Sequence, residues 1–122
     1  MTLSDIHGRL ANAAILYTIL LVLWGFFRYF RRQGLDSSYW GALAIDEVLI
    51  LVQGVLGVIL YFSPDVVLER GLHILYGIIG AITIPSTFAF TKGREERRDM
   101  LIYAVVLLFL SAILFRAQMT GG

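Results

Sequence analysis

Four long apolar segments constrain this chain more than any other feature of its sequence. They cover about residues 10–30, 40–62, 71–90 and 100–115, and short polar stretches separate them. A membrane helix needs about 20 mainly apolar residues to cross about 30 Å of hydrocarbon. Strands would need a closed barrel with alternating apolar and polar residues, and these segments do not alternate. We therefore predict an all-α integral membrane protein, with residues 1–122 forming a single domain of four transmembrane helices.

The short connections between the segments predict how the helices are arranged. Short loops make neighbouring helices antiparallel, which gives an up-down four-helix bundle. The hydrophobic content of 58% is above the roughly 45–50% of a soluble domain. The chain contains no cysteine, which excludes disulfides and thiolate chemistry. A net charge of +1 gives no indication of nucleic-acid binding.

The basic residues predict the orientation of the bundle. Seven Lys or Arg residues follow the first and third segments, and three lie on the other side. Because basic loops stay in the cytoplasm, both termini are expected outside. We expect the protein in a cytoplasmic membrane of prokaryotic type. The seven basic residues are Arg28, Arg31, Arg32, Lys92, Arg94, Arg97 and Arg98.

The two histidines occupy matching places in a weak internal repeat. An offset of 66 residues lays His7 on His73, and the small residues four and seven places later also correspond. Two helical hairpins of similar design, related by an axis along the membrane normal, would give this pattern. The first and third helices would then be diagonal, with both histidines at one depth. The matching small residues are Ala11 with Gly77 and Ala14 with Gly80.

This arrangement suggests a haem bound by two histidines. Imidazole is a common axial ligand of haem iron, and small residues beside it would leave a slot for a planar macrocycle. Arg9, Arg70 and Arg116 lie at the same outer level and could bind the propionates. The alternative is structural: small residues spaced in this way are common where membrane helices pack, and histidines at an interface are often only solvated.

A resemblance to a known family supports the haem interpretation. The run DEVLILVQGVLGVILYFSPDVVLERGLHILYGIIG, which contains Gln53, Gly54, Leu56, Gly57 and His73, resembles the heme A synthase family. DIHGRLANA, around His7, is similar to the other ligand helix of that family. The resemblance implies a four-helix half of such a protein with haem-ligating histidines. The second half is missing, and Asp5 is a weak substitute for the family's catalytic glutamate, so the resemblance implies a haem b bundle without synthase activity.

Two acids in the second segment form another candidate site. Asp46 and Glu47 lie within an apolar helix, where ionisable residues are costly and often functional. One interpretation is a salt bridge to Arg28 or Arg31, and the other is a proton path or a carboxylate beside a quinone. Gln53, deeper in the same segment, is expected to donate a hydrogen bond between helices.

These features predict a small b-type cytochrome-like protein that binds one haem between the first and third helices. We expect it to transfer electrons within a respiratory or photosynthetic complex, with quinone as a candidate partner. The alternative is a haem-free accessory subunit that packs against other membrane subunits. A weaker third interpretation is haem handling during oxidase assembly. No nucleotide-binding loop or nucleophile–base pair is present in the sequence, so no independent catalytic activity is expected.

Overall fold

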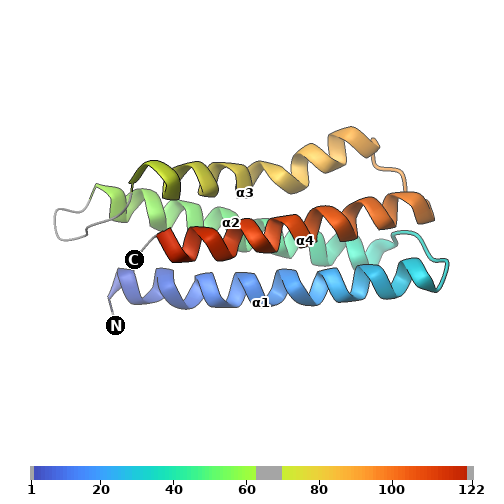
Figure 1. Cartoon of the computed structure of the whole chain (residues 1–122), viewed down its shortest axis with the longest axis horizontal. Helices are drawn as coiled ribbons and strands as arrows, with labels where there is room; N and C mark the ends of the chain where they lie inside the picture. Colours follow the sequence, from blue (N-terminus) through green and yellow to red (C-terminus); the bar gives the residue numbers. More distant parts are fainter. Residues whose placement is uncertain (1, 63–69, 121–122) are drawn as a thin grey trace.

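The structure, a computed structural model, describes residues 2–62 and 70–120 and consists there of four long helices. They are α1 (Leu3–Phe30), α2 (Ser37–Tyr61), α3 (Arg70–Thr91) and α4 (Arg97–Thr120). Figure 1 shows them side by side as an elongated bundle, with both termini at one end. Each helix is long and apolar enough to cross a membrane. The predicted all-α, four-helix membrane bundle is confirmed.

The helix order around the bundle places the histidine-bearing helices diagonally. α1 packs against α2 and α4, and α3 packs against the same two helices, with the most extensive contact between α1 and α4. Within the described residues α1 and α3 make no close backbone contact. Any interaction between these two helices is therefore made by side chains that cross the interior of the bundle.

Polar caps extend the helices beyond the apolar segments. The Thr2 hydroxyl accepts a hydrogen bond from the Asp5 N–H (3.1 Å), and the Asp5 carboxylate accepts one from the Thr2 N–H (3.0 Å). This capping box starts α1 seven residues before the predicted boundary at residue 10. Asp36 caps α2 in a similar way, so that helix starts at Ser37. Hydropathy marks the membrane-spanning part of a helix and does not reveal the polar turns at its ends.

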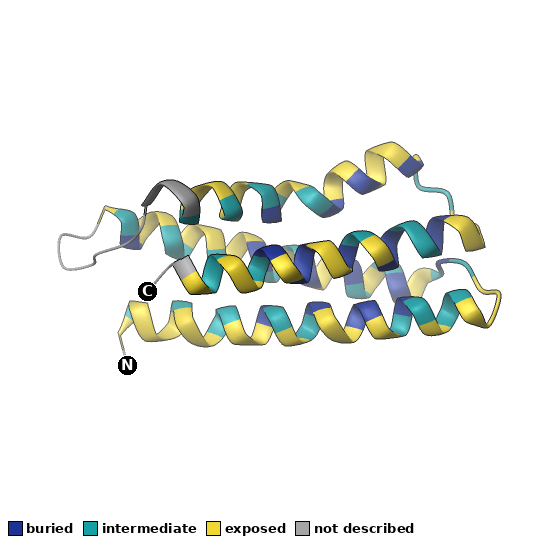
Figure 2. Cartoon of the chain, viewed as in Figure 1, coloured by how far each residue is buried: buried dark blue, intermediate teal, exposed yellow. Residues whose placement is uncertain are grey.

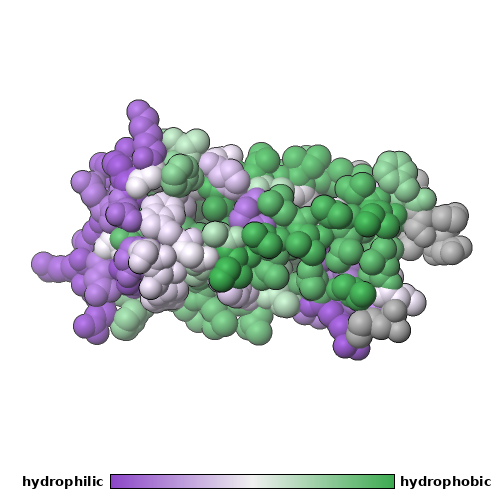
Figure 3. Space-filling view, turned by 180° about the vertical axis from the view of Figure 1, so that it is seen from behind, coloured by the Kyte–Doolittle hydropathy of each residue, from purple (hydrophilic) through white to green (hydrophobic). Residues whose placement is uncertain are grey.

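The core occupies the inward faces and is densest toward one end. Figure 2 shows buried positions along the inner sides of the helices and exposed positions outside. Large apolar side chains cover the outer faces, and Figure 3 shows a largely hydrophobic surface on one face of the molecule, from its middle toward one end. In a membrane this surface would contact lipid chains. The largest fully buried side chains are Tyr39, Tyr103, Leu43, Met100, Leu107, Leu110, Thr18, Thr91, Asp46 and Asp99.

We call the end that holds the α1–α2 and α3–α4 turns the basic end, and the opposite end the terminal end. Hydrophilic residues gather at the basic end (Figure 3). Its two turns bind each other: the Leu35 N–H donates to the Glu95 carbonyl (3.1 Å), and the Trp40 indole N–H donates to the Glu95 carboxylate (2.5 Å). Arg97 donates to the Tyr29 carbonyl (2.9 Å) and lies over the Tyr29 ring.

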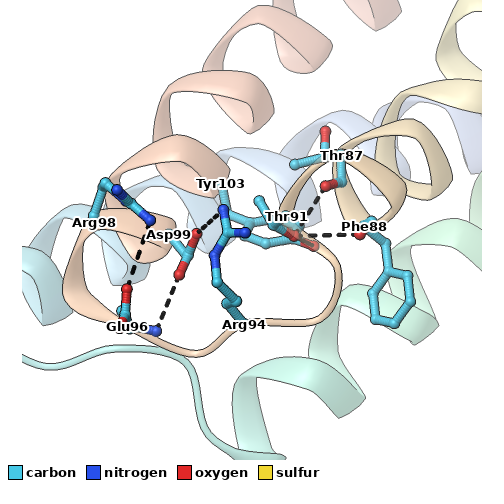
Figure 4. A network of polar contacts seen from close by, with 8 residues as sticks. All are labelled: Thr87, Phe88, Thr91, Arg94, Glu96, Arg98, Asp99 and Tyr103. Carbon is cyan, nitrogen blue, oxygen red and sulfur yellow. Dashed lines mark hydrogen bonds and ion pairs between the residues drawn. The ribbon is translucent and has the colours of Figure 1, made fainter.

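A small polar network continues this link inside the α3–α4 turn (Figure 4). The buried carboxylate of Asp99 accepts a hydrogen bond from the Glu96 N–H (3.2 Å) and lies 3.4 Å from the Arg94 guanidinium. This contact caps the start of α4. The Thr91 and Tyr103 hydroxyls lie 3.3 Å apart and join α3 to α4. The network explains the buried acid as a structural element of this turn.

Candidate functional site

The two histidines meet inside the terminal end of the bundle. His7 lies in the second turn of α1, and His73 lies in the first turn of α3. Their ring centroids are 6.1 Å apart, and the ring planes cross at 73°. Both side chains are half-buried. The diagonal placement of α1 and α3 therefore brings the only two imidazoles of the chain together.

Each imidazole has a distinct environment. The Nδ1 of His73 lies 2.9 Å from the Ala117 carbonyl of α4. A carbonyl only accepts, so Nδ1 carries the hydrogen and the lone pair of the neutral ring is on Nε2. The Nδ1 of His7 is buried and makes no hydrogen bond in the described part of the chain. The His7 ring lies against the backbone of α2 at Gly57, where an added Cβ would be 3.4 Å from Cε1.

Polar contacts join the helices around this pair. The Gln53 amide of α2 donates to the His7 carbonyl of α1 (2.7 Å), which confirms the predicted interhelical hydrogen bond. The Gln118 amide of α4 donates to the Asn12 side-chain oxygen of α1. Sequence reasoning did not assign Asn12, Gln118 or Ala117 to the site. The positions of Asn12 and Gln118 could have indicated these two amides. Both are polar residues within or beside apolar segments, at the depth of the histidines.

The small residues that follow the two histidines, on α1 and α3, differ in their surroundings. Ala11 is half-buried, and a Cβ at the exposed Gly77 would meet nothing within 4 Å. Ala14 is buried, and a Cβ at Gly80 would lie 3.5 Å from Leu114 and close to Leu110 and Ile50. Gly77 therefore faces free space at the exposed surface of α3, whereas side chains fill the space beside Gly80, about one turn deeper.

The predicted arginines lie at the terminal end. Arg9 and Arg116 are exposed, and the described residues show no ion pair for either. Arg70 is the first residue of α3, and its side chain lies outside the described part of the structure. Two guanidinium groups are therefore available at the level where the sequence predicted anion binding.

The second candidate site, at Asp46, differs from the predicted salt bridge. Asp46 is fully buried, and both carboxyl oxygens lie 2.9 Å from the Thr18 hydroxyl of α1. Arg28 instead donates to the Gly34 carbonyl and pairs with Asp36 at 3.2 Å, and Arg31 lies over the Phe27 ring. The salt-bridge prediction is wrong because the register of the α1–α2 hairpin places Asp46 beside Thr18 and places Arg28 beside Gly34 and Asp36. The end of α1 faces the start of α2, and Asp46 lies almost three turns deeper.

Fold and geometry together define a class: a four-helix integral membrane bundle with two facing histidines in one end and a buried carboxyl group in the middle. Comparison with protein-family models, with curated proteins and with solved structures found no match.

Proposed function

We propose that this protein is a small b-type cytochrome-like membrane protein that binds one haem, whose iron His7 and His73 would hold. The observation that carries the proposal is the 6.1 Å separation of the two ring centroids across the bundle. Imidazole nitrogens bind metal ions at about 2 Å, and histidine is a common ligand of haem iron, so two neighbouring imidazoles are the residues that would hold one iron.

The surroundings of the rings support the same proposal. A metal-bound histidine usually donates its other ring N–H to a carbonyl or carboxylate, which orients the ring. The His73–Ala117 contact has this form.

The remaining residues of the site would act around the cofactor. Arg9, Arg70 and Arg116 would bind the propionates through charge-assisted hydrogen bonds. The bound haem would supply one-electron redox chemistry, and the axial ligands and their hydrogen bonds would tune its potential. The resemblance of the Gln53–Gly57 and His73 motifs to the heme A synthase family is consistent with this assignment. We further propose that the protein transfers electrons within a larger respiratory or photosynthetic complex, with quinone as a candidate partner.

Absorption spectroscopy tests this proposal. The chain is produced with haem available and purified in detergent, and its spectrum is recorded in the oxidised and reduced states. We expect a Soret band and a reduced α-band. Substitutions His7→Ala and His73→Ala should each abolish the six-coordinate, low-spin signature. Met119→Ala, an exposed position at the same end, is the control and should leave the spectrum unchanged. A folded protein without a Soret band, or full low-spin haem content in both histidine variants, would refute the proposal.

The second candidate is a haem-free subunit that packs against other membrane proteins. One observation favours it: Leu110, Leu114 and Ile50 fill the space beside Gly80, so this small residue serves helix packing. The two candidates predict different spectra from the same sample. Absence of haem from the purified, folded chain, together with co-purification of a larger membrane complex, would favour the subunit.

A further inference from the structure

We propose that Asp46 and Thr18 form a proton-binding site in the membrane-spanning part of the bundle, in which the Asp46 carboxyl group is protonated and donates a hydrogen bond to the Thr18 hydroxyl. The ligand of this site is a proton, held between α1 and α2. Asp46 lies nine residues into α2, which is about 13 Å along the helix axis at 1.5 Å per residue. The site is distant from the histidine pair and does not depend on haem binding.

The first argument is a count of hydrogens. The Thr18 hydroxyl lies 2.8 Å from the Ala14 carbonyl and 2.9 Å from both oxygens of Asp46. A hydroxyl has one hydrogen to donate, and carbonyl and carboxylate oxygens only accept. If Asp46 were ionised, the single Thr18 hydrogen would have to serve all three contacts. If Asp46 is protonated, its O–H donates to Thr18 and the Thr18 O–H donates to Ala14, so two of the three contacts carry a hydrogen of their own and the second Asp46 oxygen only adjoins the hydroxyl.

The second argument is that the neighbouring donors are used elsewhere. The titratable groups nearest to Asp46 on α1 and α2 are Tyr17, Tyr39 and Glu47. The Tyr17 hydroxyl donates to the Ala42 carbonyl (2.9 Å), and the Tyr39 hydroxyl donates to the Leu21 carbonyl (2.8 Å). Glu47 would add a second negative charge beside Asp46 when ionised. None of the three therefore stabilises an ionised Asp46.

The third argument is that the other three helices have no basic residue in the middle of their sequences. α1 has no charged residue between Arg9 and Arg28, α3 has none between His73 and Lys92, and α4 has none between Asp99 and Arg116. Arg28, the nearest arginine along α1, donates to Gly34 and pairs with Asp36.

A buried carboxylate without a cation is costly, and a carboxyl group in such a place binds a proton instead. Asp46 is fully buried, and its hydrogen-bond partner in the described structure is neutral Thr18. The carboxyl group is therefore held between the helices as a neutral hydrogen-bond donor.

Infrared spectroscopy of the full chain in detergent at neutral pH tests this site. The C=O stretch of a protonated carboxyl group is separate from the bands of carboxylates and shifts in D₂O. We expect a band from Asp46 that Asp46→Asn abolishes. Glu47→Gln, the adjacent acid, is the matched control and should leave this band in place. Absence of a protonated-carboxyl band from the wild type, or a band that Glu47→Gln removes and Asp46→Asn leaves, would overturn the proposal.

Variants of the hydroxyl provide a second test that does not require Asp46 to be replaced. Thr18→Val removes the acceptor of the Asp46 O–H, so the band should remain but shift to the frequency of a carboxyl group with a weaker hydrogen bond. Thr18→Ser retains the hydroxyl and should restore the wild-type frequency. An unchanged band in Thr18→Val would show that the Asp46 proton is not donated to Thr18 and would contradict the site.

Discussion

Gly34→Ala should destabilise the bundle strongly, because this glycine allows the two turns of the basic end to touch. A Cβ at Gly34 would lie 1.7 Å from the Glu95 carbonyl oxygen and 2.8 Å from its carbonyl carbon. Both obstacles are backbone atoms, which cannot rotate away as a flexible side chain could. The turns would have to separate by roughly 1.5 Å to restore an ordinary contact distance of about 3.3 Å between carbon and oxygen.

The expected magnitude follows from the hydrogen bonds that this separation would affect. The Leu35 N–H to Glu95 bond spans 3.1 Å and would be lost, at about 1 kcal/mol. The bonds from Trp40 to the Glu95 carboxylate (2.5 Å) and from Arg97 to the Tyr29 carbonyl (2.9 Å) also cross between the turns and would weaken, and bonds to charged groups contribute about 1.5–3 kcal/mol. We therefore expect the free energy of unfolding to fall by about 2–4 kcal/mol.

The matched control is Gly41→Ala, seven residues further on. A Cβ at Gly41 would meet nothing within 4 Å, and the residue lies in the first half of α2. Replacing a glycine inside a helix by alanine should raise the free energy of unfolding by about 0.5–1 kcal/mol. The two alanine variants are therefore expected to have opposite signs.

Unfolding by a denaturing detergent, followed by circular dichroism, measures both variants against the wild type in the same mixed micelles. The expected order of stability is Gly41→Ala, wild type, Gly34→Ala. If Gly34→Ala unfolds at the same detergent fraction as the wild type, the two turns are not in the close contact described here, and the steric argument is refuted.

Two further predictions concern orientation and the link between α1 and α2. The chain has no cysteine, so single cysteines can report topology: a membrane-impermeant maleimide should label Ser4→Cys in spheroplasts and should not label Ser38→Cys unless the membrane is opened. The reverse labelling pattern would put the basic end outside. Gln53→Leu removes the hydrogen bond to the His7 carbonyl and should lower the free energy of unfolding by about 1 kcal/mol in the same detergent titration, the usual size for such bonds in membranes. A stability equal to the wild type would show that this bond contributes nothing to the fold.

Local sequence signals were sufficient for the architecture. The four apolar segments predicted the four helices, and their short connections predicted antiparallel neighbours. The diagonal relation of the histidine-bearing helices followed from the same topology. An interhelical hydrogen bond from Gln53 was also expected, and the structure adds that its partner is the His7 carbonyl of α1. The capping box of Thr2 and Asp5 extended α1 past the apolar segment, because the end of a helix depends on polar caps as well as on hydropathy.

The partner of Asp46 could not be read from the sequence in the same way. Sequence reasoning put the acid near Arg28, because the end of the first segment and the start of the second were both expected at the cytoplasmic boundary of the membrane. The register of the α1–α2 hairpin puts Asp46 beside Thr18 and places Arg28 against Gly34 and Asp36. Register depends on the turn and on side-chain packing along both helices, and neither is visible in the hydropathy of a single segment.

The sequence by itself determined that this chain is a four-helix membrane bundle, because burying apolar residues in lipid and pairing the backbone within each helix are local requirements. It also determined that His7 and His73 belong to helices running in the same direction. Only the tertiary structure decided that their rings lie 6.1 Å apart, that Gly34 touches Glu95 and that Asp46 is enclosed beside a neutral hydroxyl. These distances depend on how four helices pack together, and packing is a property of pairs of residues far apart in the chain.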